Sequence, residues 1–273
     1  LDYTTRVGLA LGVRGLINVQ MVIVSQEGKS SVFILEVNPR GSRTVPFMSK
    51  VTGVPMVKLA TKVMAGVSLK EQGYKGGLWK KSKLVGIKAP VFSMSKLTGV
   101  DNYLGPEMKS TGEVMGIDFD FAGALTKALM ASNLMLAAQG SMLLSIADRD
   151  KTEALSLVKR LHEMGYGLYA TEGTAAMIAA LGMPVKMVTK KLSEGHPNVL
   201  DVIRDGSVKA VVNTITGGRL ALKDGFAIRR AAVEHRIPCY TSLDTLKVVL
   251  DAVSAAGRPY SVESMATYLK RKK

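Results

Sequence analysis

Hydrophobic and polar positions divide the chain into three zones, the first of which covers residues 1–69. Apolar, β-branched runs at Ile17–Val24 and Ser31–Val37 predict two strands, and the turn residues Gln26–Lys29 between them predict a hairpin. Within the second run, Val32–Leu35 is almost uninterrupted, which is typical of a strand buried on both faces. Helical spacing predicts two helices, at Thr4–Leu11 and Val54–Ala65.

The second zone, residues 70–139, has a less regular pattern. It predicts a strand at Leu84–Phe92, a loop around residues 97–112 and a helix from about Phe119 to Ala138. A stripe of apolar side chains on this helix indicates core packing, and it consists of Met130, Leu134 and Met135.

The third zone, residues 140–273, alternates strand and helix patterns. Strands are predicted at Ser141–Ile146, Gly167–Ala170, Val185–Val188, Ala210–Asn213 and Pro238–Tyr240. Helices are predicted at Lys151–Met164, Thr174–Leu181, Asn198–Asp205, Phe226–His235, Ser242–Ser254 and Ser261–Tyr268. This alternation is typical of an α/β fold with an open parallel sheet and helices on both faces. Since the zone has the size of a single domain, we expect it to fold by itself.

Composition narrows the classes of function. Hydrophobic residues make up 47% of the 273 residues, and no apolar run reaches the roughly 18–20 residues of a membrane span. The net charge of +15 favours anionic ligands. Because the basic residues are scattered and do not interleave with aromatic ones, we expect phosphate-bearing small molecules rather than nucleic acid. The single cysteine, Cys239, and the lack of a leader pattern favour a cytoplasmic location.

The densest polar cluster follows the second predicted strand. Alternation places Glu36 and Asn38 on one face of that strand, and Gln20 lies in the neighbouring strand. Their oxygens suit a hard cation such as Mg²⁺, and the guanidinium groups of Arg40 and Arg43 suit phosphate oxygens. The alternative, that Glu36 and Asn38 only shape the turn after the strand, stays open at this point.

A second candidate site lies in the third zone, between a predicted strand and a predicted helix. Thr171 and Thr174 offer hydroxyls beside a helix N-terminus, and Lys151 and Lys190 could supply positive charge. The carboxyl ends of parallel strands are where ligands bind in open α/β sheets, so this pattern predicts a phosphate pocket. The alternative for each residue is a capping threonine or a surface lysine.

Long motifs along the chain carry a resemblance to a known family. They are Asn18–Gln20, Ile34–Arg40, Ser42–Phe47, Thr52–Pro55, Val63–Gly66, Gly99–Asp101, Leu104–Gly116, Ala170–Ala175, Asn213–Thr214 and Ile228–Ala231. Over these motifs the chain resembles the C-terminal part of the carbamoyl-phosphate synthase large chain. The resemblance implies the end of an ATP-grasp unit at residues 1–69 and a connecting region at 70–139. It implies a Rossmann-like, methylglyoxal-synthase-like allosteric domain at residues 140–273.

The resemblance also implies a reaction, the phosphorylation of carbamate by ATP in pyrimidine and arginine biosynthesis. In the family, positions matching Gln20, Glu36 and Asn38 hold Mg²⁺ or Mn²⁺ on the ATP phosphates. Positions matching Arg40 and Arg43 contact the transferred phosphoryl group. The implied partners are the remainder of the large chain and a glutaminase small subunit, and a homo-oligomer stays open.

For the third zone, the resemblance implies a nucleotide effector such as UMP or IMP. In the family, the phosphate and ribose are surrounded by positions matching Lys151, Thr171, Thr174, Lys190, Asn213 and Thr214. The lysine ligand is either Lys190 or its neighbour Lys191. Ornithine is less expected, because Ala89 stands where ornithine-regulated members carry a glutamate.

The same resemblance leaves alternatives to a working synthase. The upstream ATP-grasp half and its lid have no counterpart before Leu1, so we expect a piece of a longer chain that is inactive alone. The second interpretation is a stand-alone nucleotide-binding regulatory module without catalysis. A methylglyoxal-synthase-type lyase is disfavoured, because Val188–Gly195 offers lysines and a glutamate where that chemistry needs an aspartate.

Overall fold

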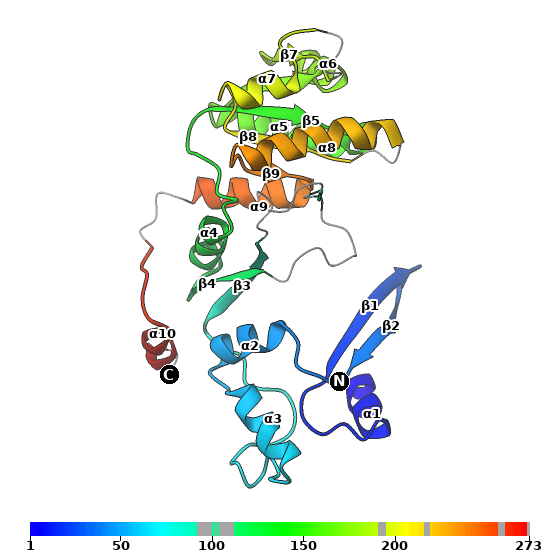
Figure 1. Ribbon diagram of the computed structural model, residues 1–273, viewed down its shortest axis with the longest axis vertical. Helices are drawn as coiled ribbons and strands as arrows, with labels where there is room; N and C mark the ends of the chain where they lie inside the picture. The colour runs from blue at the N-terminus through cyan, green and yellow to red at the C-terminus, as the bar shows by residue number, and fades with distance from the viewer. Residues whose placement is uncertain are drawn as a thin grey trace. The chain divides into compact units, whose positions relative to one another are not determined.

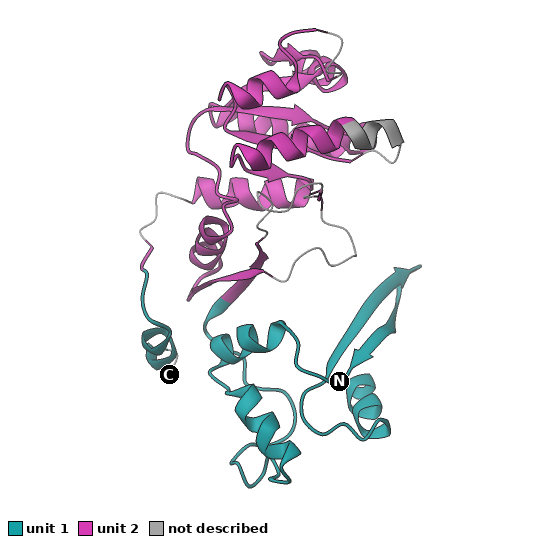
Figure 2. Cartoon of the chain, viewed as in Figure 1, with its two compact units in different colours: residues 1–85, 262–273 teal, residues 86–261 magenta. Residues whose placement is uncertain are grey.

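The computed structural model describes residues 1–91, 100–101, 103, 112–190, 195–215, 219–255 and 260–271 (Figure 1). The chain forms two compact units (Figure 2). Unit 1 consists of residues Leu1–Val85 and Val262–Lys273, and unit 2 consists of Gly86–Ser261. None of the helices in the described ranges combines the length and the hydropathy that a membrane crossing requires.

Unit 1 contains the predicted hairpin. β1 (Asn18–Gln26) and β2 (Lys29–Asn38) pair antiparallel, which confirms the hairpin prediction. The two residues between them, Glu27 and Gly28, both have positive φ, as a tight two-residue hairpin turn requires. The helices of unit 1 are α1 (Asp2–Ala10), α2 (Thr44–Thr52), α3 (Met56–Met64) and α10 (Met265–Arg271).

The prediction that Val32–Leu35 is buried on both faces is wrong. All four side chains are exposed, and Phe33 and Leu35 keep 53% and 59% of their surface accessible. Beside them, an open groove of about 510 Å³ lies between β2 and α1, lined by Tyr3, Val7 and Phe33 among others. A continuous apolar run is typical of a strand buried on both faces, but the run alone does not determine whether the fold places other segments over those faces.

The sequence pattern did not predict α2. This helix begins directly after the polar cluster, and Pro46 lies in its first turn, where a missing N–H costs no helical hydrogen bond. It ends at Gly53, whose φ of 72° is the left-handed conformation that glycine adopts most easily. Polar residues at the start of α2 therefore concealed a short helix.

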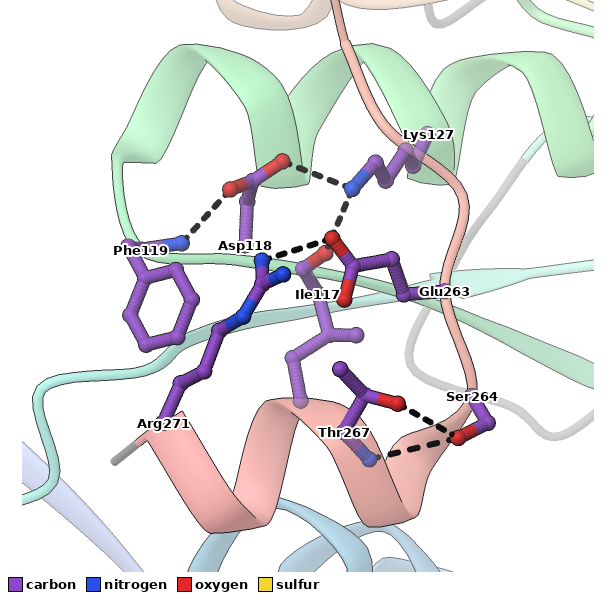
Figure 3. Close-up of polar contacts among 8 residues, drawn as sticks. All are labelled: Ile117, Asp118, Phe119, Lys127, Glu263, Ser264, Thr267 and Arg271. Atoms are coloured by element: carbon purple, nitrogen blue, oxygen red, sulfur yellow. Dashed lines mark hydrogen bonds and ion pairs between the residues drawn. The ribbon is translucent and has the colours of Figure 1, made fainter. Parts of the chain in front are cut away.

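Polar side chains stabilise both ends of the last helix, α10. Ser264 Oγ accepts a hydrogen bond from the Thr267 amide at 3.2 Å, and Arg271 pairs with Glu263 at 2.7 Å (Figure 3). The helix was predicted at Ser261–Tyr268, but it begins at Met265, directly after the capping residue Ser264, and ends at Arg271.

In the described residues of unit 2, five strands form a parallel sheet in the order β7-β6-β5-β8-β9 (Figure 1). The strands are β5 (Ser141–Ser145), β6 (Gly167–Thr171), β7 (Lys186–Val188), β8 (Ala210–Asn213) and β9 (Cys239–Tyr240). The helices are α4 (Phe121–Ala131), α5 (Lys151–Glu163), α6 (Glu172–Ala180), α7 (Val199–Arg204), α8 (Arg219–Glu234) and α9 (Leu243–Ser254), with a 3₁₀ turn η1 (Asp148–Asp150). The predicted α/β class and the predicted strands of this zone are confirmed.

Helices cover both faces of this sheet. Along β5, Met142 and Leu144 belong to one buried cluster, whereas Leu143 belongs to another. The first cluster includes side chains of α4, α5, α6 and α9, and the second includes side chains of α7 and α8. This alternation is what a parallel sheet with helices on both faces requires.

The helix predicted from Phe119 to Ala138 is too long. α4 ends at Ala131, Ser132 Oγ donates to the Ala128 carbonyl at 2.9 Å, and Asn133 follows with a φ of 56°. The predicted core stripe is also partly wrong, because Met130 is 45% exposed. Leu134 and Met135 do pack against the core, from the irregular segment after the helix, so their apolar spacing imitated a helix.

Before α4 lie β3 (Val85–Pro90) and β4 (Glu113–Asp118), which pair as neighbours. Only the first of these strands was predicted, and most of the predicted loop at 97–112 lies outside the described residues. At the end of β4, the Asp118 carboxylate accepts hydrogen bonds from Lys127 Nζ at 2.6 Å and from the Phe119 amide at 2.7 Å (Figure 3). This ion pair ties β4 to α4.

Candidate functional site

The hairpin brings the three predicted cation ligands together. Gln20 and Glu36 are direct partners in the antiparallel register, and Asn38 Nδ2 donates to Glu36 Oε1 at 2.9 Å. The register shifts next to Gln20, because Met21 pairs with Ile34 and leaves Leu35 as an extra residue. Such a bulge re-aims the side chains beside it and is frequent next to active sites.

This donor set fits a divalent ion that is carried mainly by phosphates. It offers one carboxylate, from Glu36, and two amide oxygens, from Gln20 and Asn38. Mg²⁺ keeps several waters and is usually held by one or two carboxylates together with substrate phosphates. In the described ranges, no group of three or more His, Cys, Asp or Glu side chains could hold a metal by itself. Glu36, Gln20 and Asn38 would therefore hold an ion together with a phosphate ligand.

The two predicted phosphate-contacting arginines flank the start of α2. Arg40 follows β2, where its Nη1 donates to the Gly41 carbonyl at 3.0 Å. Arg43 is the residue immediately before the first turn of α2, and both arginines are exposed. The Arg40 guanidinium is therefore bonded to the neighbouring backbone, and it would have to break this hydrogen bond to donate to a phosphate oxygen.

In unit 2, the predicted phosphate pocket is a cavity of about 170 Å³ at the carboxyl ends of the strands. Its lining includes five of the six predicted effector residues, which are Lys151, Thr171, Thr174, Lys190 and Thr214. The alternative lysine, Lys191, lies outside the described residues. Glu172 and Gly173 also line it, within the predicted Thr171–Thr174 segment, and the sequence pattern missed the lining residues Ser145, Ile146, Ala147 and Asp148.

The hydroxyls in this cavity have different partners. Thr174 Oγ1 accepts the Ile146 amide at 3.0 Å, and Thr214 Oγ1 accepts the Ala147 amide at 2.8 Å. Thr171 precedes α6 but makes no capping hydrogen bond, and among the described residues its hydroxyl has no partner. The capping alternative is therefore excluded for Thr171, whose hydroxyl remains available to a ligand.

Carboxylates limit the positive charge of the cavity. Lys151 Nζ lies 2.7 Å from Asp148 Oδ1, and Glu172 Oε1 accepts the Lys190 amide at 3.2 Å. The hydrogen bond from Lys151, and then its charge, lower the pKa of the Asp148 carboxyl below its ordinary value, with a smaller contribution from Lys190. An anion entering the cavity must therefore compete with Asp148 for Lys151.

The sixth predicted residue, Asn213, does not line the cavity. It ends β8 and lies buried directly before Thr214, where its Nδ2 donates to the Ser145 carbonyl at 3.5 Å. Its Oδ1 accepts a hydrogen bond from Arg229 Nη1 at 2.5 Å. Arg229 belongs to the motif Ile228–Ala231, but the sequence pattern gives no sign of this contact.

Known proteins match both units. Residues 3–72 match the family model of the carbamoyl-phosphate synthase L chain, ATP binding domain, and residues 153–241 match that of the MGS-like domain. The chain is 51% identical over 269 residues to the carbamoyl phosphate synthase large chain of Thermomicrobium roseum. That alignment covers 98% of this chain and 25% of the relative, so the chain spans about a quarter of the relative's length.

A solved structure also matches part of the chain. The methylglyoxal synthase from Elizabethkingia anophelis NUHP1 is 17% identical, with a TM-score of 0.34, over 50% of this chain and 95% of that protein. Taken together, the two family models and the relative show that the chain is similar to the C-terminal part of a carbamoyl-phosphate synthase large chain.

Proposed function

We propose that this chain is a segment of a carbamoyl-phosphate synthase large chain, an ATP-dependent ligase, and that its hairpin contributes to the phosphorylation of carbamate by ATP. The observation that carries the proposal is the pairing of Gln20 with Glu36, with Asn38 bonded to Glu36. The 51% identity to a protein of that name supports it. Pyrimidine and arginine biosynthesis, a cytoplasmic location, and the glutaminase small subunit and the rest of the large chain as partners belong to the same proposal.

The proposed chemistry suits the residues present. Phosphoryl transfer depends on positioning and on neutralising charge, so few covalent tools are needed. Mg²⁺ or Mn²⁺, when bound, would neutralise charge on the ATP phosphates. The side chains of Gln20, Glu36 and Asn38 would hold the metal ion in position. Arg40 and Arg43 would donate to the oxygens of the transferred group near the start of α2, where backbone N–H groups also point outward.

The test joins this chain to the upstream portion of a related large chain and measures carbamoyl phosphate formation. We expect no product from the chain alone, and product from the joined protein. Arg40→Ala and Arg43→Ala should each lower kcat about a hundredfold with a smaller effect on the KM for ATP. Lys58→Ala, an exposed residue of α3, is the matched control. Turnover by the chain alone, or unchanged kcat in both arginine variants, would contradict the proposal.

The second half of the proposal is that the cavity of unit 2 binds the phosphate of a regulatory nucleotide. Thr171 offers an uncommitted hydroxyl at the N-terminus of α6, and Lys151 and Lys190 line the same cavity. A thermal-shift titration of the whole chain with UMP, IMP and ornithine tests this. We expect stabilisation by a nucleotide, and its loss in Lys151→Ala. Stabilisation by ornithine alone would contradict it.

One observation favours a second candidate function, a stand-alone nucleotide-binding module. Most buried hydrophobic side chains of the described residues belong to unit 2, whereas the β1–β2 hairpin of unit 1 leaves its apolar side chains exposed. Unit 2 thus has a hydrophobic core of its own. Nucleotide binding by the chain, combined with no product from the joined protein, would favour this alternative.

A further inference from the structure

An ion pair with a buried arginine is linked by hydrogen bonds to the wall of the proposed nucleotide cavity. Among the described residues, Arg229 on α8 is the one charged residue that is buried, with 1% of its surface accessible. A buried guanidinium is strongly unfavourable unless its charge and its N–H groups are paired. Gly225, one turn earlier, makes room for it, since a Cβ there would lie 2.7 Å from Arg229 Nη1.

The charge of Arg229 is paired by a residue far away in the sequence. Arg229 Nε donates to Asp101 Oδ1 at 2.7 Å, and Nη2 donates to Asp101 Oδ2. The two residues are 128 positions apart, and the side chain of Asp101 remains 26% exposed. This bidentate geometry fixes the orientation of the guanidinium plane.

The third nitrogen of Arg229 orients Asn213. A guanidinium can only donate, so the oxygen it contacts at 2.5 Å must be Asn213 Oδ1. Asn213 Nδ2 is then directed toward the Ser145 carbonyl, which also accepts the Thr214 amide at 3.2 Å. Since Ser145 and Thr214 both line the cavity, Asp101 is linked to its wall through Arg229 and Asn213.

We propose that Asp101 is a positioning residue for the effector site, acting through Arg229 to hold Asn213 and the Ser145–Ala147 wall in the conformation that accepts a nucleotide. The proposal rests on the proposed nucleotide site. By linkage, a nucleotide that favours this conformation also favours the Asp101–Arg229 pair. Asp101 lies in the sequence zone between the ATP-grasp match and the MGS-like match, so the pair connects effector binding to that zone.

The geometry predicts a selective effect on ligands. Thr171 and Lys151 are the residues proposed to receive the phosphate, whereas Asn213 is buried and contacts the Ser145 side of the cavity, which we assign to the rest of the nucleotide. Loss of the pair should therefore weaken UMP binding about threefold to tenfold, the effect of one hydrogen bond, and leave inorganic phosphate binding unchanged. A purely structural role would weaken both ligands together.

The experiment uses the whole chain and two kinds of variant. Asp101→Asn removes the charge and keeps the shape, but it leaves Arg229 partly unpaired and could unfold the chain. The double variant Asp101→Leu with Arg229→Met replaces the ion pair by apolar groups, a change that often preserves stability. Arg230→Ala is the control, because Arg230 is on the same helix and pairs with Glu234 at 2.8 Å.

UMP and inorganic phosphate are titrated by calorimetry, and amide hydrogen exchange of residues 145–147 is measured without ligand. We expect the folded double variant to bind UMP more weakly, to bind phosphate normally and to exchange these amides faster. Unchanged exchange and unchanged UMP affinity in the double variant would overturn the proposal, as would an equal loss for both ligands. If the wild-type chain binds no nucleotide, the proposed effector function fails, and hydrogen exchange still decides whether Asp101 positions this wall.

Discussion

Lys151 and Asp148, which both line the cavity in unit 2, form an ion pair with 2.7 Å between Nζ and Oδ1. The Asp148 side chain is 89% exposed, so the pair is accessible to solvent and to a ligand. Salt bridges of this kind contribute little to stability, because water screens them. The pair therefore matters more for the affinity of the cavity than for the fold.

We predict that Asp148→Asn strengthens anion binding. The carboxylate holds Lys151 and repels an incoming phosphate, and the amide removes this competition without changing the shape of the side chain. Phosphate and UMP affinity, measured by calorimetry, should rise about twofold to fivefold, with no change in melting temperature. Glu153→Gln, which removes an exposed carboxylate from the first turn of α5, is the control. Weaker binding by Asp148→Asn would show that Asp148 contacts the ligand itself.

The two threonines at the start of α6 should behave differently on substitution by valine. Thr174 Oγ1 accepts the buried Ile146 amide, so Thr174→Val leaves an unsatisfied N–H and should lower the free energy of unfolding by about 1–3 kcal/mol. Thr171→Val removes a hydroxyl that bonds to no described residue, so it should reduce phosphate affinity and leave stability nearly unchanged. Chemical denaturation and phosphate titration of both variants check this. An equal loss of stability in the two variants would contradict it.

Gly116 allows β4 to lie directly on α4. A Cβ at this position would lie 1.9 Å from the Ala124 carbonyl oxygen and 2.5 Å from the Ala128 backbone nitrogen. Because neither backbone atom can move without displacing the helix, Gly116→Ala should destabilise unit 2 by about 3 kcal/mol or more. Gly76→Ala is the control, since a Cβ there meets nothing within 4 Å. Equal melting temperatures for the two variants would show that β4 and α4 can separate at little cost.

The start of α7 predicts a dependence of stability on pH. Asp201 Oδ2 accepts the Asn198 amide at 2.8 Å and contacts His196 Nδ1 at 2.5 Å. The hydrogen bond from the Asn198 backbone, and then that from His196, lower the pKa of the Asp201 carboxyl. This contribution to stability is therefore present above the ordinary pKa of aspartate, about 4, and is lost as pH falls through the lower folded-state value.

Asp201→Asn tests this prediction. The variant should melt at a lower temperature than the wild type at pH 7, and the difference should shrink as the pH is lowered from 5 to 3. Asp205→Asn, at the other end of α7, is the matched control. A difference that stays constant over this pH range would show that the charge of Asp201 does not contribute.

The packing of α4 predicts that fragments of unit 2 are more stable when they include this helix. Leu125 and Leu129 of this helix belong to the same buried cluster as Met142, Leu246 and Leu250. A fragment of residues 132–255 exposes the surface they cover, whereas a fragment of residues 112–255 keeps it buried. Two fully buried leucines correspond to about 3–6 kcal/mol, so urea denaturation should show the longer fragment to be more stable by about that amount. Equal stability would show that α4 is dispensable for this core.

Local patterns determined much of unit 2. The apolar runs of β5 and β8 and the helical spacing of α5 predicted their elements to within one or two residues, because a buried parallel sheet demands continuous apolar strands. The junction between β6 and α6 likewise predicts that Thr171 lies in a pocket at the carboxyl ends of the strands, and Thr171 does line the cavity there. The same logic placed Glu36 and Asn38 on one face, which the hydrogen bond between their side chains confirms.

Tertiary structure decided which of these residues remain available to a ligand. Thr171 and Thr174 have equivalent side chains three positions apart, yet only packing against β5 commits the hydroxyl of Thr174 to the Ile146 amide. Asp101 and Arg229 meet across 128 positions, a contact that no local pattern encodes. Secondary structure follows from neighbours in the sequence, whereas buried charges and hydroxyls are satisfied by whichever groups the fold brings to them, and that is fixed only when the layers pack.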